Sequence, residues 1–357
     1  MARGKESWQA ASHKRPPQNR GKNNKPLPKQ DEVQVTVSTI PLALQQKCLN
    51  IFRDALPSGD DDAVLLQEVK GHLYKRDFAT AFGKDEYLKI YASRWSASRA
   101  LGYIQILRDL QEKLLAGHDE DEVLKVICLG GGAGAEVVAL GAWLHEQNGS
   151  ESDAQLSIQA LMLDIAAWDT IVNGLQHAVV NPPVLSKYAS AAAKAANVRM
   201  LSEDVFKTQF QQVDALDLSD EKSQALYGGA DLITLMFTLN ELYSTSVPKT
   251  QKMLARITDA AQPGTHLLVV DSPGSYSTVT INGAEKKYPI QWLLDHTLLG
   301  TQQKRGEEEK PVKWEKLVSD DSRWFRLPEG LEYRMELENM RYQIHLYRRQ
   351  GEVEVEE

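Results

Sequence analysis

The stretch VLKVICLGGGAGAEVVALGAW, residues 123–143, decides the fold of this 357-residue chain. Val123–Leu129 is an almost wholly apolar run of strand length, and Gly130–Gly134 ends it. Residues 135–147 then place apolar side chains at helical spacing. Glycine allows a sharp turn and a close approach to a ligand, and the free N–H groups of a helix start offer hydrogen bonds. The stretch predicts a strand, a ligand-binding turn and a helix, the alternative being a flexible turn without a ligand.

The same pattern of strand and helix continues along the chain. Further apolar runs predict strands at 158–163, 198–201, 230–237 and 266–270, and helices are expected at 168–179, 185–196 and 248–261. Strands that alternate with helices indicate a parallel, doubly wound sheet of α/β class. Near the end, Met340, Tyr342, Ile344 and Leu346 alternate with polar residues, and a second strand is expected at 333–337. No helix separates these two runs, so an antiparallel pair is expected to finish a Rossmann-like sheet.

The region before the sheet has a different character. Helices are expected from Pro41 to Leu56, from the acidic turn 60–62 to Phe82, and from Lys84 to Gly117. In the last of these an apolar stripe recurs at helical spacing, formed by Tyr103, Leu107, Leu110 and Leu114. We therefore expect a disordered basic tail over 1–32, a helical domain over 33–120, a ligand-binding α/β domain over 121–350 and an acidic tail over 351–357.

Charge is distributed unevenly. The chain carries a net charge of −8, yet residues 1–29 hold eight Lys or Arg and only Glu6, a net of +7, which leaves −15 for the rest. Basic arms commonly contact nucleic acid or direct nuclear import, although a solubilising tail is the alternative. We expect a nuclear or nucleolar location, with the cytoplasm as the alternative. No apolar run predicts a secretory signal or a membrane span, and two cysteines predict neither a disulfide framework nor a metal site.

Two ligand families fit the glycine turn. Gly130, Gly132 and Ala135 satisfy a loose dinucleotide-binding fingerprint, while Gly130, Gly132 and Gly134 match the first motif of class I S-adenosylmethionine methyltransferases. Both place an acid after the second strand to hold ribose hydroxyls, and here that acid is Asp164, with a helix N-cap as the alternative. Asp204 and Val205 follow the expected third strand, where an acid and an apolar residue commonly hold adenine in methyltransferases. These two residues and the antiparallel pair favour a methyltransferase over a dehydrogenase.

The chain also resembles a known family at several stretches. These are YASRWSASRALGY at 91–103, CLGGGAGAE at 128–136, FTLNELY at 237–243, YPIQWLLDHTLL at 288–299 and ELENMRYQIHLYR at 336–348. They resemble the fungal S-adenosylmethionine-dependent methyltransferases that modify N3 of a uridine in 25S rRNA. The resemblance implies a class I methyltransferase fold, S-adenosylmethionine as cofactor and large-subunit rRNA as partner. Cys128 departs from the superfamily, where an acid often stands at this position.

Residues near the expected chemistry follow from this resemblance. Asn240 and Glu241 come after the fourth strand, where Glu241 would accept the uridine N3 proton and Asn240 would hold the base. Capping and first-turn roles in a helix are their alternatives. Arg94, or Arg99 on the same helix, would meet the methionine carboxylate or an RNA phosphate, and a surface salt bridge is the alternative.

Two other functions remain open at this stage. The glycine turn also suits an NAD(P)-dependent oxidoreductase, and a catalytically silent RNA-binding scaffold would keep the same fold. The segment Arg323-Trp324-Phe325-Arg326 interleaves basic and aromatic side chains, which suits phosphate contact and base stacking, or equally core aromatics beside solvated charges.

Overall fold

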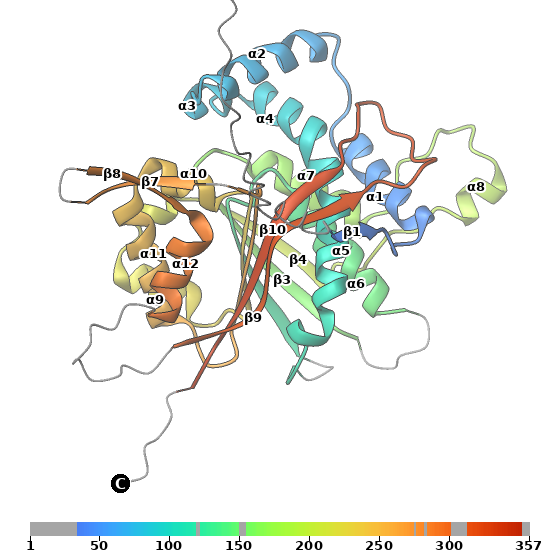
Figure 1. The fold of residues 1–357 in the computed structure, drawn as a ribbon. Helices are drawn as coiled ribbons and strands as arrows, with labels where there is room; N and C mark the ends of the chain where they lie inside the picture. The colour runs from blue at the N-terminus through green and yellow to red at the C-terminus, as the bar shows by residue number, and fades with distance from the viewer. Residues whose placement is uncertain are drawn as a thin grey trace, which may run out of the picture. The chain divides into compact units, whose positions relative to one another are not determined.

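The chain folds into a sheet covered by helices on both faces (Figure 1). The computed structural model describes residues 34–118, 122–149, 155–274, 276–281, 284–300 and 313–351. Within this part of the chain, eight strands form one sheet in the order β1-β9-β10-β6-β5-β2-β3-β4. The doubly wound α/β sheet predicted from the sequence is confirmed.

Five neighbouring strands of the sheet run parallel, with β4 at the edge, and they are built as predicted around the run before the glycine turn. They are β2 (Val123–Leu129), β3 (Ser157–Asp164), β4 (Phe206–Gln212), β5 (Leu232–Met236) and β6 (His266–Asp271). Leu129 at the end of β2 pairs with Leu163 on one side and Leu235 on the other. Because parallel strands end at one edge, the segments that follow them gather there, at the edge where doubly wound sheets bind ligands.

The last two strands of the chain run antiparallel, as predicted, but one of them is not where the sequence suggested. β10 (Met340–Arg349) lies between β6 and β9 (Trp314–Arg326), and β1 (Gln34–Val37) pairs in parallel with β9. The strand predicted at 333–337 is wrong, because those residues form a loop between β9 and β10. The sequence hides β9 because it is charged, half exposed and interrupted by a bulge.

The predicted strand at 198–201 is also wrong. Met200 and Leu201 are buried, but their N–H groups both bond to the carbonyl of Val179, which makes a turn against α7 (Asp169–Val180). The strand at this edge is β4, whose sequence FKTQFQQ buries one face and exposes the other. An edge strand rich in glutamine has little of the apolar signal that marks a central strand.

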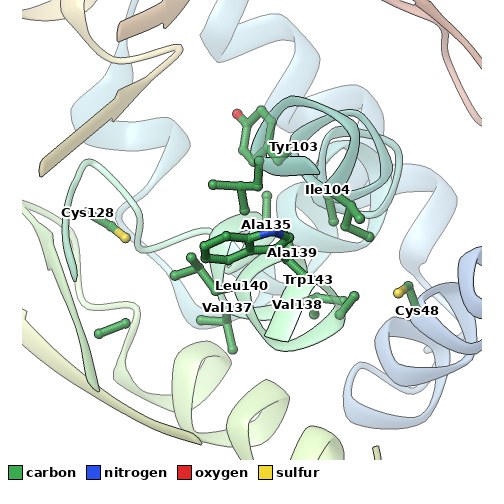
Figure 2. Close-up of a cluster of buried hydrophobic side chains, with 14 of the residues drawn as sticks. Cys48, Tyr103, Ile104, Cys128, Ala135, Val137, Val138, Ala139, Leu140 and Trp143 are labelled. Atoms are coloured by element: carbon green, nitrogen blue, oxygen red, sulfur yellow. The ribbon is translucent and has the colours of Figure 1, made fainter. Parts of the chain in front are cut away.

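Helices cover the two faces of the sheet in separate groups. One face carries α1 (Leu42–Ala55), α5 (Ala97–Leu114), α6 (Ala135–Gln147) and α7, and the other α9 (Asp220–Tyr227), α11 (Val247–Ala260) and α12 (Ile290–Leu299). Figure 2 shows the indole of Trp143 at the centre of the first core, between side chains of α6 and Ile104 of α5. Trp143 has no exposed surface, so its whole side chain is part of this core.

The N-terminal helices are more broken than predicted. The expected helix 60–82 divides into α2 (Asp62–Tyr74) and α3 (Phe78–Ala81), because Arg76 between them adopts a φ of 57°. The third helix begins as α4 (Asp85–Tyr91) and passes through a π-helical turn, η1 (Ala92–Ser96), into α5. In the described part of the chain these helices belong to the same compact unit as the sheet, and the predicted domain boundary near residue 120 stays a prediction.

The remaining described elements are small. They are α8 (Ala191–Ala195), a short piece of the helix expected at 185–196, α10 (Leu239–Thr245), the 3-10 turn η2 (Ala215–Asp217) and the hairpin of β7 (Tyr276–Ile281) and β8 (Ala284–Pro289). The predicted basic and acidic tails lie outside the described residues. No helix in the described segments is both long and apolar enough to cross a membrane.

Candidate cofactor and active site

A cavity of about 580 Å³ lies at the carboxyl edge of the parallel strands. This volume is within the range of small-molecule sites. Its walls come from the glycine turn, from the segments after β3, β4 and β5, and from α3 and α5. Its charged lining residues are Arg99, Glu136, Asp164, Asp214 and Glu241. Aromatic residues in contact with one another cover one side, namely Phe78, Phe82, Tyr91 and Trp168.

Neighbouring side chains pack closely against the glycine turn that lines the cavity. Gly130 has a φ of 76°, and a Cβ there would lie 2.3 Å from Thr238 Oγ1. Gly132 packs so closely on Trp168 that a Cβ would lie 2.1 Å from Trp168 Cδ1. Gly130 and Gly134 line the cavity, while Gly132 touches lining residues without being one. The turn therefore needs glycine for reasons internal to the protein, and it still presents its backbone to the cavity.

Asp164 ends β3 and faces the cavity, in the position where a ribose-binding acid was predicted. Its Oδ2 accepts the N–H of Gly132 at 3.2 Å, and its Oδ1 accepts the N–H of Ala166 at 3.1 Å. Burial raises the pKa of Asp164, and these two backbone donors partly offset that effect. Each carboxyl oxygen keeps a lone pair, so the group can still accept hydroxyl hydrogen bonds from a bound ligand.

The placement predicted for Asp204 and Val205 is wrong. Both precede β4, and the carbonyl of Val205 bonds to the N–H of Ile158 at the amino edge of the sheet. The acid that follows this strand is Asp214, which lines the cavity and caps η2 by accepting the N–H of Leu216 at 2.9 Å. Because the third strand was misplaced in the sequence, the prediction named an acid at the opposite edge of the sheet from the cavity.

The two arginines of the N-terminal helices have different environments. Arg94 is buried and does not line the cavity, because its guanidinium donates to the carbonyl of Glu336 at 3.0 Å and pairs with the Glu338 carboxylate. The prediction that Arg94 holds the cofactor is therefore wrong. Arg99 lines the cavity, donates to Tyr91 Oη at 3.0 Å and lies 5.0 Å from the centre of the Phe237 ring. A π-helical turn, η1, lies between Tyr91 and Arg99 in the chain.

Glu241 and Asn240 lie in the first turn of α10, directly after β5. Glu241 lines the cavity, and its side chain is exposed to solvent. Burial raises the pKa of Glu241 to about 7, while Arg99 opposes the shift and Asp164 and Asp271 add to it. Asn240 is not a lining residue, and its N–H donates to the Asp271 carboxylate at 2.9 Å. Its role in holding a base stays a prediction.

Known proteins with similar sequence identify the family. A family described as putative SAM-dependent methyltransferases matches residues 51–348. The chain is also 34% identical, over 299 residues, to the 25S rRNA (uridine(2843)-N(3))-methyltransferase of Saccharomyces cerevisiae, a match that covers 79% of this chain and 76% of the yeast protein. The chain belongs to this family of S-adenosylmethionine-dependent methyltransferases.

Solved structures of other methyltransferases are similar to this chain at low sequence identity and low TM-score. One from Clostridium acetobutylicum is 9% identical with a TM-score of 0.36, over 78% of this chain and 99% of the other. One from Methanosarcina mazei is 10% identical with a TM-score of 0.34, over 66% of this chain and 95% of the other.

The cavity fits the cofactor of this methyltransferase family. S-adenosylmethionine carries a sulfonium and an amino group, and four carboxyl groups line the cavity against the one guanidinium of Arg99. Asp164 is placed to accept ribose hydroxyls, and Arg99 offers a planar donor fork suited to the methionine carboxylate. Among the described residues, no cluster of three or more His, Cys, Asp or Glu is arranged to hold a metal ion.

Sequence reasoning missed two features of this site. Glu136 in α6 is buried, lines the cavity and accepts a short hydrogen bond from Thr234 Oγ1, and burial raises its pKa to about 7. Cys128 and Glu136 both fill the space beside Gly131, since a Cβ there would lie 2.7 Å from Cys128 Cβ and 2.8 Å from Glu136 Oε2. Glu136 therefore places a carboxyl group next to Cys128, the position at which the superfamily often has an acid. The second missed feature is Phe237, which has a φ of 60° that no sequence signal indicates.

Proposed function

We propose that this methyltransferase transfers a methyl group to N3 of a uridine in large-subunit rRNA. The substrate rests on the yeast relative, whose name specifies a 25S rRNA uridine and its N3 atom. The chemistry rests on one observation, the position of the Glu241 carboxylate in the cavity lining directly after β5, where the cavity walls raise its pKa to about 7. A group with this pKa is a competent proton acceptor near neutral pH.

Uridine N3 carries a proton, and its lone pair becomes nucleophilic when that proton leaves. Glu241 would accept the proton as the bond from N3 to the new methyl group forms. Bound S-adenosylmethionine supplies an electrophilic methyl group on a positively charged sulfur and leaves as neutral S-adenosylhomocysteine. Because the displacement is in line, the protein contributes mainly by fixing the two reactants. Phe82, Tyr91 and Trp168 would exclude water from one side of the site.

Glu241→Gln tests the proposal. The substitution keeps size and most hydrogen bonding but removes the base, so the single-turnover rate of 3-methyluridine formation should fall by roughly a hundredfold or more. S-adenosylhomocysteine affinity should change little. Glu221→Gln is a matched control, because Glu221 is an exposed acid in the first turn of α9. If Glu241 served only as a first-turn residue, both variants would keep the wild-type rate and lose a few tenths of a kcal/mol of stability.

The rate should also depend on pH in a defined direction. Glu241 must be deprotonated to act, and its pKa of about 7 means that kcat/KM should rise up to about pH 7 and level off above it. In Glu241→Gln this rise should disappear. A wild-type profile that is flat between about pH 5 and 8 would place the base elsewhere.

We also propose that the protein acts in the nucleus or nucleolus, where precursor rRNA is assembled. The support is the net charge of +7 over residues 1–29, since basic arms commonly serve nuclear import or RNA binding. A fluorescent fusion of the full chain should accumulate in the nucleolus, and a purely cytoplasmic signal would contradict the proposal.

A further inference from the structure

An indole flanked by two guanidinium groups lies near the carboxyl end of β9. Trp324 pairs in register with Arg341 of β10 and with Val35 of β1. The Arg326 guanidinium carbon lies 3.9 Å from the centre of the Trp324 ring, and that of Arg341 lies 5.7 Å away. Trp324 is half-buried while both arginines are exposed. The sequence left open whether this segment is core or surface, and the structure places Trp324 and Arg326 at the surface.

These two arginines are not neutralised by carboxylates of the described chain. Arg341 Nε donates to Ser322 Oγ at 3.1 Å, and no ion pair within the described segments involves Arg341 or Arg326. Arg323 nearby differs, because it pairs with Asp320 at 2.9 Å. The chain as a whole has a net charge of −8, so this pair of exposed, unpaired guanidinium groups is a local positive patch. Beside an aromatic ring, such a patch suits an anion that also carries a planar aromatic group.

The site lies on the same edge of the sheet as the active site. β9 and β6 both run antiparallel to β10, so their carboxyl ends lie at the same edge of the sheet. Gln343 of β10 pairs with Asp271, the residue that accepts the N–H of Asn240 next to Glu241. Arg341 lies two residues from Gln343, about 7 Å along the strand, and β9 is about 10 Å from β6 across the sheet.

We propose that Trp324, with Arg326 and Arg341, binds an unpaired nucleotide of the RNA substrate that flanks the target uridine. The proposal rests on the proposed function. The base stacks on the layer that the indole forms with the Arg326 guanidinium lying against it, and the Arg341 guanidinium contacts an adjoining phosphate, a combination that single-stranded RNA sites use. A strand whose target base lies at Glu241 then continues across the ends of β6 and β10 to this stacking site.

The stacking is tested with Trp324→Ala and a short single-stranded oligouridine, with binding followed by fluorescence anisotropy. Removing the indole on which one base stacks should weaken binding roughly five- to hundredfold. Trp324→Phe keeps an aromatic face and should retain most of the affinity. S-adenosylhomocysteine affinity measured by calorimetry should stay at the wild-type value in both variants, which also shows that they are folded.

The phosphate-binding role is tested with Arg341→Gln and a matched control on the same strand. Arg348→Gln removes an arginine at the opposite edge of the sheet, one whose charge is already paired with Glu315 at 2.7 Å. Arg341→Gln should reduce the salt dependence of oligouridine binding by about 0.7 in log–log slope for each phosphate that Arg341 neutralises in the wild type. Arg348→Gln should leave that slope unchanged.

The outcomes separate this proposal from the proposed function. The stacking site is overturned if Trp324→Ala and Arg341→Gln bind oligouridine as tightly as the wild type, or if the wild type does not bind it. This holds even if the wild type forms 3-methyluridine in rRNA. If both variants bind RNA more weakly but no 3-methyluridine forms with any rRNA, the stacking site stands and the proposed reaction fails. A surface that binds a protein instead would give unchanged RNA binding, and so would also overturn the site.

Discussion

Asp164 and Asp204 show at the level of single residues how position along a strand decides a role. Both are acids beside a strand of the sheet, but Asp164 ends β3 at the cavity and Asp204 precedes β4 at the opposite edge. A charged hydrogen bond contributes roughly 1.5–3 kcal/mol, so Asp164→Ala should weaken S-adenosylmethionine binding about ten- to hundredfold. Asp204→Ala is the control and should bind as the wild type does. Calorimetry on both variants measures this, and equal affinities would remove Asp164 from the site.

Glu136 should make the stability of the protein depend on pH. Its pKa is raised by burial from 4.5 to about 7, so the folded state holds a proton that the unfolded state releases. The stability that Glu136 contributes to the folded state is therefore fully present below about pH 4.5 and is lost as the pH rises toward and beyond 7. Glu136→Gln should gain stability relative to the wild type over this range, by at most about 3 kcal/mol. Denaturant unfolding at several pH values measures the difference, and a difference independent of pH would contradict the assignment.

At the level of elements, Arg94 joins the π-helical turn η1 to the loop before β10. It is 5% exposed and holds the Glu336 carbonyl and the Glu338 carboxylate. Arg94→Met should therefore lower the free energy of unfolding by about 1–3 kcal/mol while leaving cofactor affinity unchanged. Arg53→Met removes an exposed pair with Asp54 and should cost less than about 1 kcal/mol. A large drop in S-adenosylhomocysteine affinity in Arg94→Met, at unchanged stability, would return Arg94 to the cofactor site.

For the whole molecule, the charge of the N-terminal segment predicts how RNA affinity responds to salt. Deleting residues 1–29 removes a net charge of +7 and should make the salt dependence of rRNA binding shallower. Cofactor binding should not change, because the cavity is built from later residues. Equal salt slopes for the full and the truncated chain would leave this segment a solubilising role only.

The sequence by itself determined the centre of the fold and the outline of the cofactor site. Strong local signals carried this information: the buried run at 123–129, the glycine turn after it and the acid Asp164 at the end of the next strand. Each depends on residues close together in the chain, so periodicity and turn chemistry suffice to identify it. The antiparallel finish of the sheet followed in the same way from the alternation at 340–346.

Only the tertiary structure decided which residues meet at the cavity. β4 and β9 are exposed on one face and polar, so their stability comes from pairing with neighbours distant in sequence, and local propensity does not reveal them. Because β4 was misplaced, Asp204 was expected at the cavity, where Asp214 lies instead. Arg99 lines the cavity, while Arg94 pairs with residues of a loop more than 240 positions away in the chain. Such choices depend on long-range packing, which fixes where a side chain points only once the whole chain has folded.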